Sequence, residues 1–179
     1  MTAGLISSYT STTVYVEYIS GAVGADTQGI GQSFTANEYM ILDYCWFYIG
    51  KWGSPTGSAY ANLYAHSGTF GTSGIPTGSA LATTDAFDVS TLSTSNAWKQ
   101  FFFSGANRIP IAPGTNYVLT LEFTGGDADN DVQAVYDNTS STHEGNGSTK
   151  FNGTWVQHNS GDFCFYLYGV TKQNFPLWL

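Results

Sequence analysis

Residues 39–49 read YMILDYCWFYI, and they indicate the fold of this chain more strongly than any other segment. It is a run of aromatic and β-favouring residues, typical of a strand that is buried on both faces. The following GKWGSPTG, residues 50–57, is a turn cluster that breaks any helix and lets the chain reverse. SAYANLYAH, residues 58–66, alternates small or apolar residues with polar or aromatic ones. That period of two predicts a second strand with one face turned inward.

The rest of the chain repeats this order of strand, loop and strand. Further strands are expected at residues 14–19, 30–36, 97–103, 116–123, 132–136 and 162–170. Residues 66–81 are rich in glycine and are expected to form a long surface loop. Asn152-Gly153 is a strong hairpin signal within residues 150–156. About ten short antiparallel strands without a helical period predict an all-β fold, a single jelly-roll β-sandwich.

Two of the predicted strands assign side chains to faces. In residues 97–103 the side chains of Trp98, Gln100 and Phe102 are expected on one face, opposite Phe101 and Phe103. In residues 116–123 the inward set is expected to be Tyr117, Leu119, Leu121 and Phe123.

The length of 179 residues is that of one domain, which we place at residues 14–170. Residues 1–13 are expected to form an arm or an edge strand. Residues 171–179 form a tail that ends in large apolar side chains, namely Phe175, Leu177, Trp178 and Leu179. This tail either straps onto its own sandwich or docks on another chain, because exposed apolar patches mark interfaces. We expect it to be an assembly contact.

The composition excludes several classes of function. Only 10% of the residues are charged while 16% are aromatic, so the chain is not intrinsically disordered. The net charge of −8 and the five scattered basic residues exclude nucleic acid as a partner. No apolar run approaches the ~20 residues of a transmembrane helix, and the first residues lack the features of a signal peptide. The Ser, Thr, Gly, Asn and Tyr bias nevertheless predicts a place on a virion surface or outside cells.

The two cysteines, Cys45 and Cys164, both lie in strand-like apolar runs. Their simplest interpretation is two buried thiols that act as small apolar side chains. A disulfide between them requires Cα atoms within ~7 Å, which the sequence does not define.

An acidic loop carries the one pattern that suggests a metal ion. Asp127, Asp129 and Asp131 form an Asp-x-Asp-x-Asp run, and alternate carboxylates in an extended loop can converge on Ca²⁺. Val132 and His143 occupy the positions where an EF-hand requires Gly and Glu, so an EF-hand is excluded. A structural calcium ion and a solvated acidic turn remain alternatives, and no other cofactor is implied.

Aromatic side chains are the candidates for binding a ligand. Sugars stack on flat aromatic faces and need amide or carboxylate partners for their hydroxyl groups. Trp52, in the turn-rich loop, is the first candidate, followed by Tyr64, Tyr136 and Trp155. The alternative for each is packing in the core or at its rim.

The order of short motifs resembles a broad group of jelly-roll, galactose-binding-like and carbohydrate-binding-module-like domains of phage structural proteins and bacterial surface proteins. The motifs are Gln32-Ser33-Phe34-Thr35, Gly53-Ser54-Pro55-Thr56-Gly57, Asn62-Leu63-Tyr64, Ile75-Pro76, Ala112-Pro113-Gly114-Thr115-Asn116-Tyr117, Asn152-Gly153-Thr154-Trp155 and Asp162-Phe163-Cys164-Phe165. The likeness covers roughly residues 28–170. It implies a non-catalytic display or binding domain. The apolar tail departs from the group and favours a stand-alone subunit of an assembly.

The sequence contains no Gly-x-Ser-x-Gly, His-Glu-x-x-His or phosphate-loop motif. We therefore expect no enzyme but a structural or attachment protein of a virion or cell surface, such as a phage capsid decoration, fibre or tail component. Its expected partners are other virion or surface proteins and further copies of itself. The rival hypothesis is a carbohydrate-binding module that uses Trp52, with or without Ca²⁺. A glycan-cleaving enzyme using carboxylates such as Asp43 and Glu122 is the third.

Overall fold

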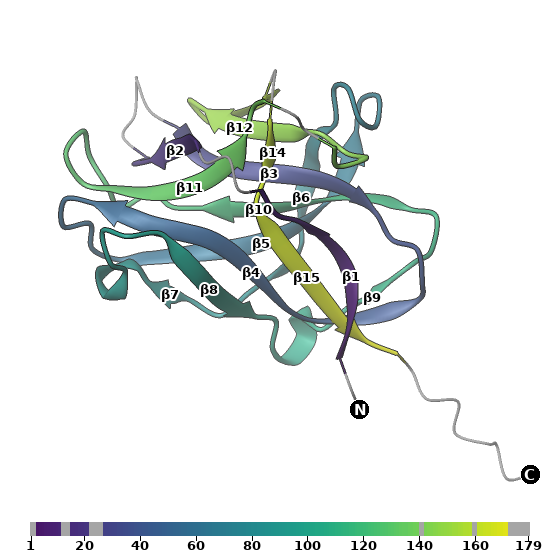
Figure 1. Ribbon diagram of the computed structural model, residues 1–179. Coiled ribbons are helices and arrows are strands. Elements are labelled where there is room, and N and C mark those ends of the chain that lie inside the picture. The colour runs from purple at the N-terminus through teal and green to yellow at the C-terminus, as the bar shows by residue number, and fades with distance from the viewer. Residues whose placement is uncertain (1–2, 12–14, 22–26, 140–141, 159–160, 172–179) are drawn as a thin grey trace, which may run out of the picture.

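The computed structural model of the protein describes residues 3–11, 15–21, 27–139, 142–158 and 161–171. These residues form an all-β fold of mostly antiparallel strands (Figure 1). Their only helical segments are the 3₁₀ turns η1 (Val89–Thr91) and η2 (Gly105–Asn107). In this part of the chain no helix has the length and apolar character needed to span a bilayer.

Fifteen strands make up the described fold. They are β1 (Ala3–Tyr9), β2 (Tyr15–Ile19), β3 (Thr27–Thr35), β4 (Met40–Trp52), β5 (Ser58–Ser67), β6 (Ile75–Thr83), β7 (Phe87–Asp88), β8 (Ala97–Phe102), β9 (Pro110–Ile111), β10 (Asn116–Glu122), β11 (Asp131–Asp137), β12 (Gly147–Phe151), β13 (Thr154–Gln157), β14 (Asp162–Phe163) and β15 (Phe165–Val170).

The strands group into two layers that pack face to face (Figure 1). In the first layer the long strand β4 pairs with β15 on one side and with β8 on the other, and β1 extends the layer beyond β15. In the second layer β10 lies between β3 and β5, with β12 beyond β3 and β6 beyond β5. Strand β11 pairs with β4 and with β2 and so joins the layers at one end. The arrangement is sandwich-like.

The core lies between the layers and is made of large apolar side chains. Phe34 of β3 and Phe165 of β15 approach across the layers, with ring centroids 6.5 Å apart. Phe47 of β4 packs edge-to-face on Phe101 of β8 at 6.0 Å. Burial of such side chains contributes about 1.5–3 kcal/mol each, so this interior dominates the stability of the fold.

The structure corrects three expectations about strands. It contains fifteen strands instead of about ten, because several ladders are only two residues long. Residues 66–81, expected to be a loop, include most of β6, which pairs with the end of β5 despite its glycine. Residues 39–49 are not buried on both faces, because one side of β4 faces solvent and is only half-buried. This outer side of β4 is central to the site described below.

Two detailed expectations are confirmed. The predicted inward set of residues 116–123 is buried, and so are Phe101 and Phe103 on the inner side at β8. The hairpin of β12 and β13 turns at Asn152 and Gly153, whose φ angles of 47° and 76° lie in the left-handed region that Asn and Gly favour.

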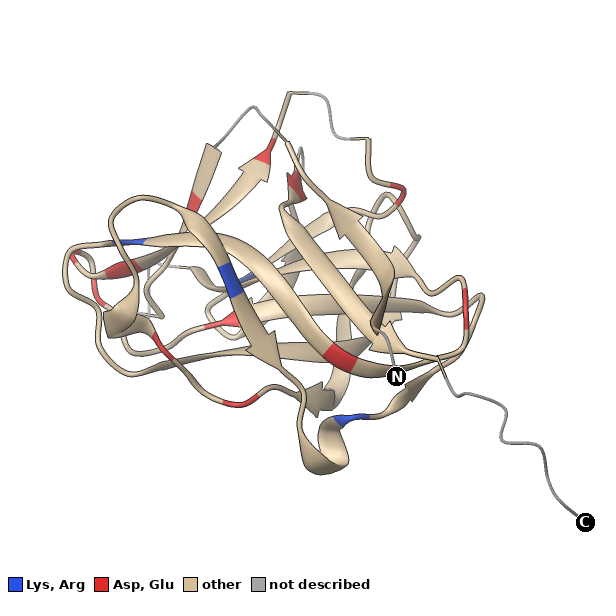
Figure 2. Ribbon diagram, turned by 60° about the horizontal axis from the view of Figure 1, so that its bottom comes forward, with Lys and Arg blue, Asp and Glu red and all other residues tan. Residues whose placement is uncertain are grey.

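Charged residues are spread over the described surface without a basic cluster (Figure 2). Two ion pairs are present among the described residues. Arg108 lies 2.8 Å from Asp43, and Lys150 lies 2.7 Å from Glu122.

Candidate functional site

The outer side of the first layer carries a concentration of aromatic side chains, which we call the aromatic face. It consists of Tyr44, Trp46 and Tyr48 of β4, Trp98 and Phe102 of β8, and Tyr166 and Tyr168 of β15. On β4 these residues alternate with the buried Cys45, Phe47 and Ile49. Because strand side chains alternate between faces, burying the second set turns the first toward solvent.

Strand register arranges the aromatic face in rows across the layer. Tyr48 lies opposite Trp98 in the first row. Trp46 lies between Gln100 of β8 and Tyr166 of β15 in the second. Directly opposed side chains on one face of a sheet have Cβ atoms about 4.5–5.5 Å apart, so the large side chains in these rows lie close together.

The third row extends this surface toward β1. Tyr44 lies between Phe102 and Tyr168, and Leu5 of β1 lies opposite Tyr168. Phe102 and Leu5 are each 50% exposed, so this end of the face is the more apolar one.

The rings of the aromatic face other than Trp46 form a continuous chain of contacts. Trp98 lies 5.1 Å from Tyr48 and 4.7 Å from Tyr166, measured between ring centroids. Tyr44 and Tyr168 stack at 4.8 Å with an angle of 25° between their planes. A shallow hollow of about 370 Å³ lies among these rings, and its lining consists of Tyr44, Trp46, Trp98, Tyr166 and Tyr168. This volume is at the lower end of the range of small-molecule sites, about 300–1,000 Å³.

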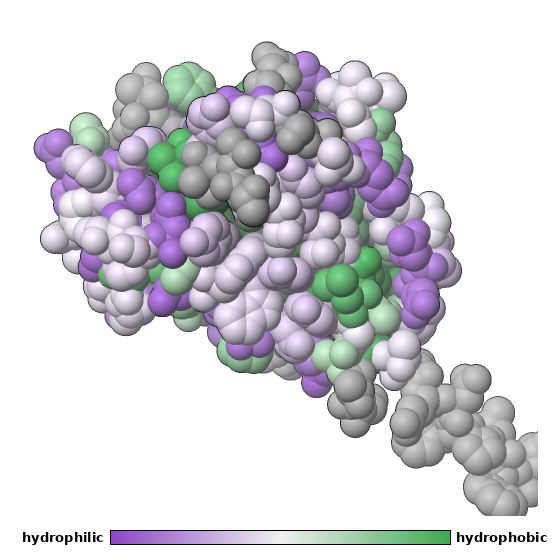
Figure 3. Space-filling view, viewed as in Figure 1, coloured by the Kyte–Doolittle hydropathy of each residue, from purple (hydrophilic) through white to green (hydrophobic). Residues whose placement is uncertain are grey.

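The space-filling view places this surface in its surroundings (Figure 3). Side chains of intermediate hydropathy cover the middle of the face over β4, β8 and β15, and a hydrophobic patch lies over β1. Strongly hydrophilic residues gather toward the sides of this view.

The pKa of the Tyr44 hydroxyl lies above its usual value. Burial within the face is the largest cause, and the neighbouring Tyr168 and Asp43 add to it. The hydroxyl is therefore neutral at physiological pH.

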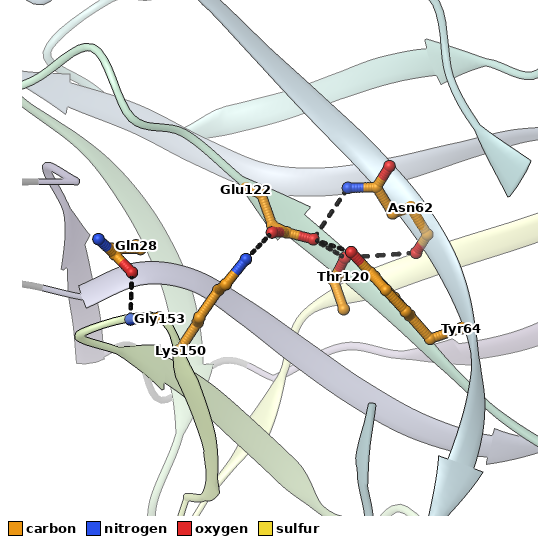
Figure 4. Close-up of polar contacts among 7 residues, drawn as sticks. All are labelled: Gln28, Asn62, Tyr64, Thr120, Glu122, Lys150 and Gly153. Atoms are coloured by element: carbon orange, nitrogen blue, oxygen red, sulfur yellow. Dashed lines mark hydrogen bonds and ion pairs between the residues drawn. The ribbon is translucent and has the colours of Figure 1, made fainter. Parts of the chain in front are cut away.

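A second candidate lies on the outer side of the other layer, around Glu122 of β10 (Figure 4). Oε1 of Glu122 accepts hydrogen bonds from Asn62 Nδ2 at 2.9 Å, Tyr64 OH at 2.9 Å and Thr120 Oγ1 at 3.1 Å. Oε2 accepts from Lys150 Nζ at 2.7 Å. We call these five residues the Glu122 cluster. Its carboxylate has four donors, which is near the capacity of its lone pairs.

Two predicted ligand-binding residues meet at the Glu122 cluster. The rings of Tyr64 and Trp155 are 6.3 Å apart, edge to face, and Lys150 Nζ lies 5.7 Å from the centroid of Trp155. Burial, then the charge of Glu122 and the hydrogen bond to it, raise the pKa of Tyr64 well above its usual value. A hollow of about 280 Å³ beside the cluster is also lined by Tyr60, which is 39% exposed.

Trp52, the first sequence candidate, lies at the end of β4 and is 57% exposed. It borders a hollow of about 300 Å³ together with Tyr18, Ala128 and Asp131. Tyr18 of β2 is 46% exposed, while Asp131 is buried and lies opposite Trp52 in the ladder of β4 and β11. Two exposed aromatic rings therefore flank this hollow.

In the acidic loop beside Trp52, the first carboxylate accepts hydrogen bonds from other residues of the same loop. Asp127 Oδ1 accepts hydrogen bonds from the Asp129 backbone N at 2.9 Å and from Asn130 Nδ2 at 2.8 Å. These donors lower the pKa of Asp127. Asp131 belongs to β11. Over the described ranges no three His, Cys, Asp or Glu side chains gather as a metal site would require. A calcium ion at this loop stays a prediction.

The loop also explains one glycine of the turn that follows β4. Gly53 has φ +67°, and a Cβ atom there would collide with the backbone oxygen of Asp129. Ser54 N donates to Asn130 Oδ1 at 2.7 Å. The two loops are therefore locked together, which fixes the position of Trp52.

The remaining sequence candidates lie elsewhere. Tyr136 of β11 is half-buried and contacts Tyr15, His158 and Phe163. Cys45 and Cys164 are buried free thiols, as their apolar surroundings predicted, and burial raises the pKa of both. Phe175, Leu177, Trp178 and Leu179 lie outside the described residues.

A buried polar group that sequence reasoning missed links β3 to the segment before β12. Gln32 Nε2 donates to Asp162 Oδ1 at 2.8 Å and lies 3.2 Å from His143 Nδ1. Gly145 N also donates to His143 Nδ1, at 3.1 Å, so this nitrogen is an acceptor. The ring proton is therefore on Nε2, which lies 3.2 Å from Ser7 Oγ. Burial lowers the pKa of His143, and Glu144 opposes this shift.

Sequence reasoning also missed most of the aromatic face. The alternation of side chains with a period of two could have shown which residues of β4 and β15 face outward. It could not show which strands lie beside β4, because those strands come from distant parts of the sequence.

Comparison with protein-family models and with curated proteins finds no match for this chain.

Proposed function

We propose that this protein is a non-catalytic structural or attachment protein of a virion or cell surface, folded as a jelly-roll β-sandwich. The observation that carries the proposal is the aromatic face, seven aromatic side chains on the solvent side of three adjacent strands. Six of the seven side chains are half-buried and Phe102 is exposed, so together they present a partly apolar surface to solvent. Large contiguous surfaces of this kind are uncommon on monomeric proteins and mark interaction sites. Display in several copies would add avidity to weak individual contacts.

The carboxylates considered for catalysis have contacts that favour structural roles. Asp43 pairs with Arg108 at 2.8 Å, and Glu122 accepts four hydrogen bonds. A general acid in glycoside hydrolysis needs an open path to the glycosidic oxygen. The oxygens of these two carboxylates are instead in contact with donors of the protein itself.

The proposal is tested by retention of the fluorescently labelled full chain on bacterial envelopes. Tetramers on streptavidin are incubated with intact Gram-positive and Gram-negative cells, with labelled serum albumin as the control. We expect retention after washing and no release of reducing sugar. The proposal fails if no surface retains the chain, or if reducing ends appear at a rate that Asp43→Asn or Glu122→Gln abolishes.

A second candidate function, a carbohydrate-binding module centred on Trp52, is favoured by the pair of exposed rings. Trp52 and Tyr18 flank one hollow of about 300 Å³, as two rings that sandwich a sugar would. If this site is the functional one, Trp52→Ala abolishes glycan binding and Trp46→Ala does not.

A further inference from the structure

The lining of the hollow in the aromatic face is uniform in chemistry. Its five residues are all Tyr or Trp, without an aliphatic or charged side chain among them. Tyr and Trp combine an apolar ring with a polar tip, so they suit a partner that is itself half apolar and half polar. Aliphatic protein interfaces and lipid tails lack the second property.

The polar tips of these rings have no protein partner in the described part of the chain. The hydroxyl groups of Tyr44, Tyr48, Tyr166 and Tyr168 make no hydrogen bond to another described residue. The side-chain amide of Gln100 lies in the same row as Trp46. Donors and acceptors that are left to solvent around a set of stacking faces are the groups that sugar hydroxyls require.

The charges around the aromatic face indicate whether its ligand is neutral or charged. The nearest carboxylate in sequence, Asp43, is paired with Arg108, and Lys99 of β8 lies in the inner row opposite Phe47. The aromatic face is thus uncharged, while the whole chain carries a net charge of −8. An anionic polymer would be repelled by the protein and would find no cation in the hollow.

The shape of the surface favours a chain over a single sugar. The ring contacts run without a break from Tyr48 through Trp98, Tyr166 and Tyr168 to Tyr44. An extended surface of this kind offers stacking positions to several successive rings of a linear polymer. Each position contributes weakly, and the polymer adds their contributions together.

We propose that the aromatic face binds a linear neutral polysaccharide, whose pyranose rings stack on Trp46 and Trp98 and whose hydroxyl groups bond the surrounding tyrosine and glutamine tips. This inference rests on the proposed attachment function and specifies the partner of that surface. Pyranoses with equatorial hydroxyl groups present flat C–H faces, so β-linked glucans are the polymers that fit this chemistry best.

The test is native affinity electrophoresis of the full chain in gels that contain hydroxyethyl cellulose, barley β-glucan or xyloglucan. Polygalacturonate serves as the anionic comparison. We expect at least one neutral polymer to retard the wild-type chain, with no effect of 0.5 M NaCl on the affinity measured in solution. Trp46→Ala and Trp98→Ala should each weaken binding about tenfold, as loss of an interface anchor does.

Matched controls are Trp52→Ala and Trp155→Ala, which remove indole rings outside the aromatic face. Thermal unfolding of each variant shows whether it is folded, and Tyr168→Ala provides a further position if Trp98→Ala is not. The inference is overturned if no neutral polymer retards the wild type, or if Trp52→Ala or Trp155→Ala loses binding while Trp46→Ala retains it.

Envelope retention separates failure of this inference from failure of the proposed function. If cells retain the chain through the aromatic face, but protease treatment of the cells abolishes retention and neutral polymers have no effect, the partner is a protein and the inference fails alone. If light scattering shows self-association that Trp46→Ala abolishes, again without binding to a neutral polymer, the occupant is a second copy. If no envelope retains the chain, the proposed function itself fails.

Discussion

The two outer faces of the sandwich follow the same alternation of strand side chains but differ in how their polar groups are used. On β10 and its neighbours, the Glu122 carboxylate accepts four hydrogen bonds from Asn62, Tyr64, Thr120 and Lys150. On β4 and β15, the hydroxyl groups of Tyr44, Tyr48, Tyr166 and Tyr168 make no hydrogen bond to another described residue. A polar cluster whose groups are all hydrogen-bonded holds strands together, whereas an aromatic surface whose hydroxyl groups are not bonded to the protein is available to a partner.

The largest expected change in stability comes from comparing two neighbouring residues of β15, one in the core and one on the aromatic face. Phe165 is fully buried and its neighbour Tyr166 lies on the aromatic face. Phe165→Ala should lower the free energy of unfolding by about 3–5 kcal/mol, because it leaves a cavity in the core. Tyr166→Ala should lower it by only about 1 kcal/mol. Urea unfolding measures both, and equal losses would contradict the assignment of Tyr166 to a solvent-facing surface.

The next largest change in stability is expected from a substitution in the Glu122 cluster. Glu122→Ala leaves several part-buried donors, including Lys150 Nζ, without their acceptor. We expect a loss of about 1–3 kcal/mol in the free energy of unfolding. Glu38→Ala, at an exposed position, is the matched control and should change stability by less than about 0.5 kcal/mol. Polysaccharide binding should be unchanged in both variants, and its loss in Glu122→Ala alone would assign binding to the other face.

Acid should lower the free energy of unfolding but leave ligand binding at the aromatic face unchanged. Burial lowers the pKa of His66, His143 and His158, so the unfolded chain binds protons more tightly than the folded one. Protonation of these histidines therefore favours the unfolded chain. The free energy of unfolding is highest above the unfolded-state pKa of about 6.5 and decreases as the pH falls below it.

Urea unfolding between pH 7.5 and 5.0 measures this dependence. His143→Gln should reduce the slope by up to about 1.4 kcal/mol per pH unit, the value for one proton. Retardation by a neutral polymer should stay constant wherever the chain is folded, because the aromatic face contains no carboxylate, imidazole or amine. A rise in stability on acidification would contradict the assignment of His143 Nδ1 as an acceptor.

The smallest effect is expected at the ion pair beside the aromatic face. The side chains of Arg108 and Asp43 are 40% and 26% exposed. Asp43→Asn should therefore cost at most about 1 kcal/mol of stability, and less in 0.5 M NaCl. A thermal unfolding series in salt measures this change. A loss of several kcal/mol would show that Asp43 has a larger role than a surface pair allows.

Much of the local structure could be predicted from the sequence. The period of two in residues 116–123 identified the buried face of β10, and Asn152-Gly153 identified the β12–β13 turn, since both signals are local. The extent of β6 could not be predicted, because a strand that follows a glycine-rich segment looks like part of a loop until a neighbour such as β5 supplies hydrogen bonds.

The candidate site was less accessible to sequence reasoning. Tyr44, Trp46 and Tyr48 sit in an almost continuous apolar run, and such a run is typical of a strand covered on both sides. Only the pairing of β4 with β8 and β15, from distant parts of the chain, shows that one side is uncovered. Trp52 was recognisable because its turn is local, while its neighbour Tyr18 comes from a strand far earlier in the chain.

Affinity electrophoresis of Trp46→Ala and Glu122→Gln side by side in one neutral polysaccharide gel decides which of the two outer faces binds the polymer. The contrast between the two outer faces predicts that Glu122→Gln is retarded like the wild type, although it is less stable. Trp46→Ala should be retarded much less than the wild type, because its affinity falls about tenfold. Retardation of Trp46→Ala equal to that of the wild type, with loss of binding in a folded Glu122→Gln, would contradict the claim and move the binding surface to the opposite layer.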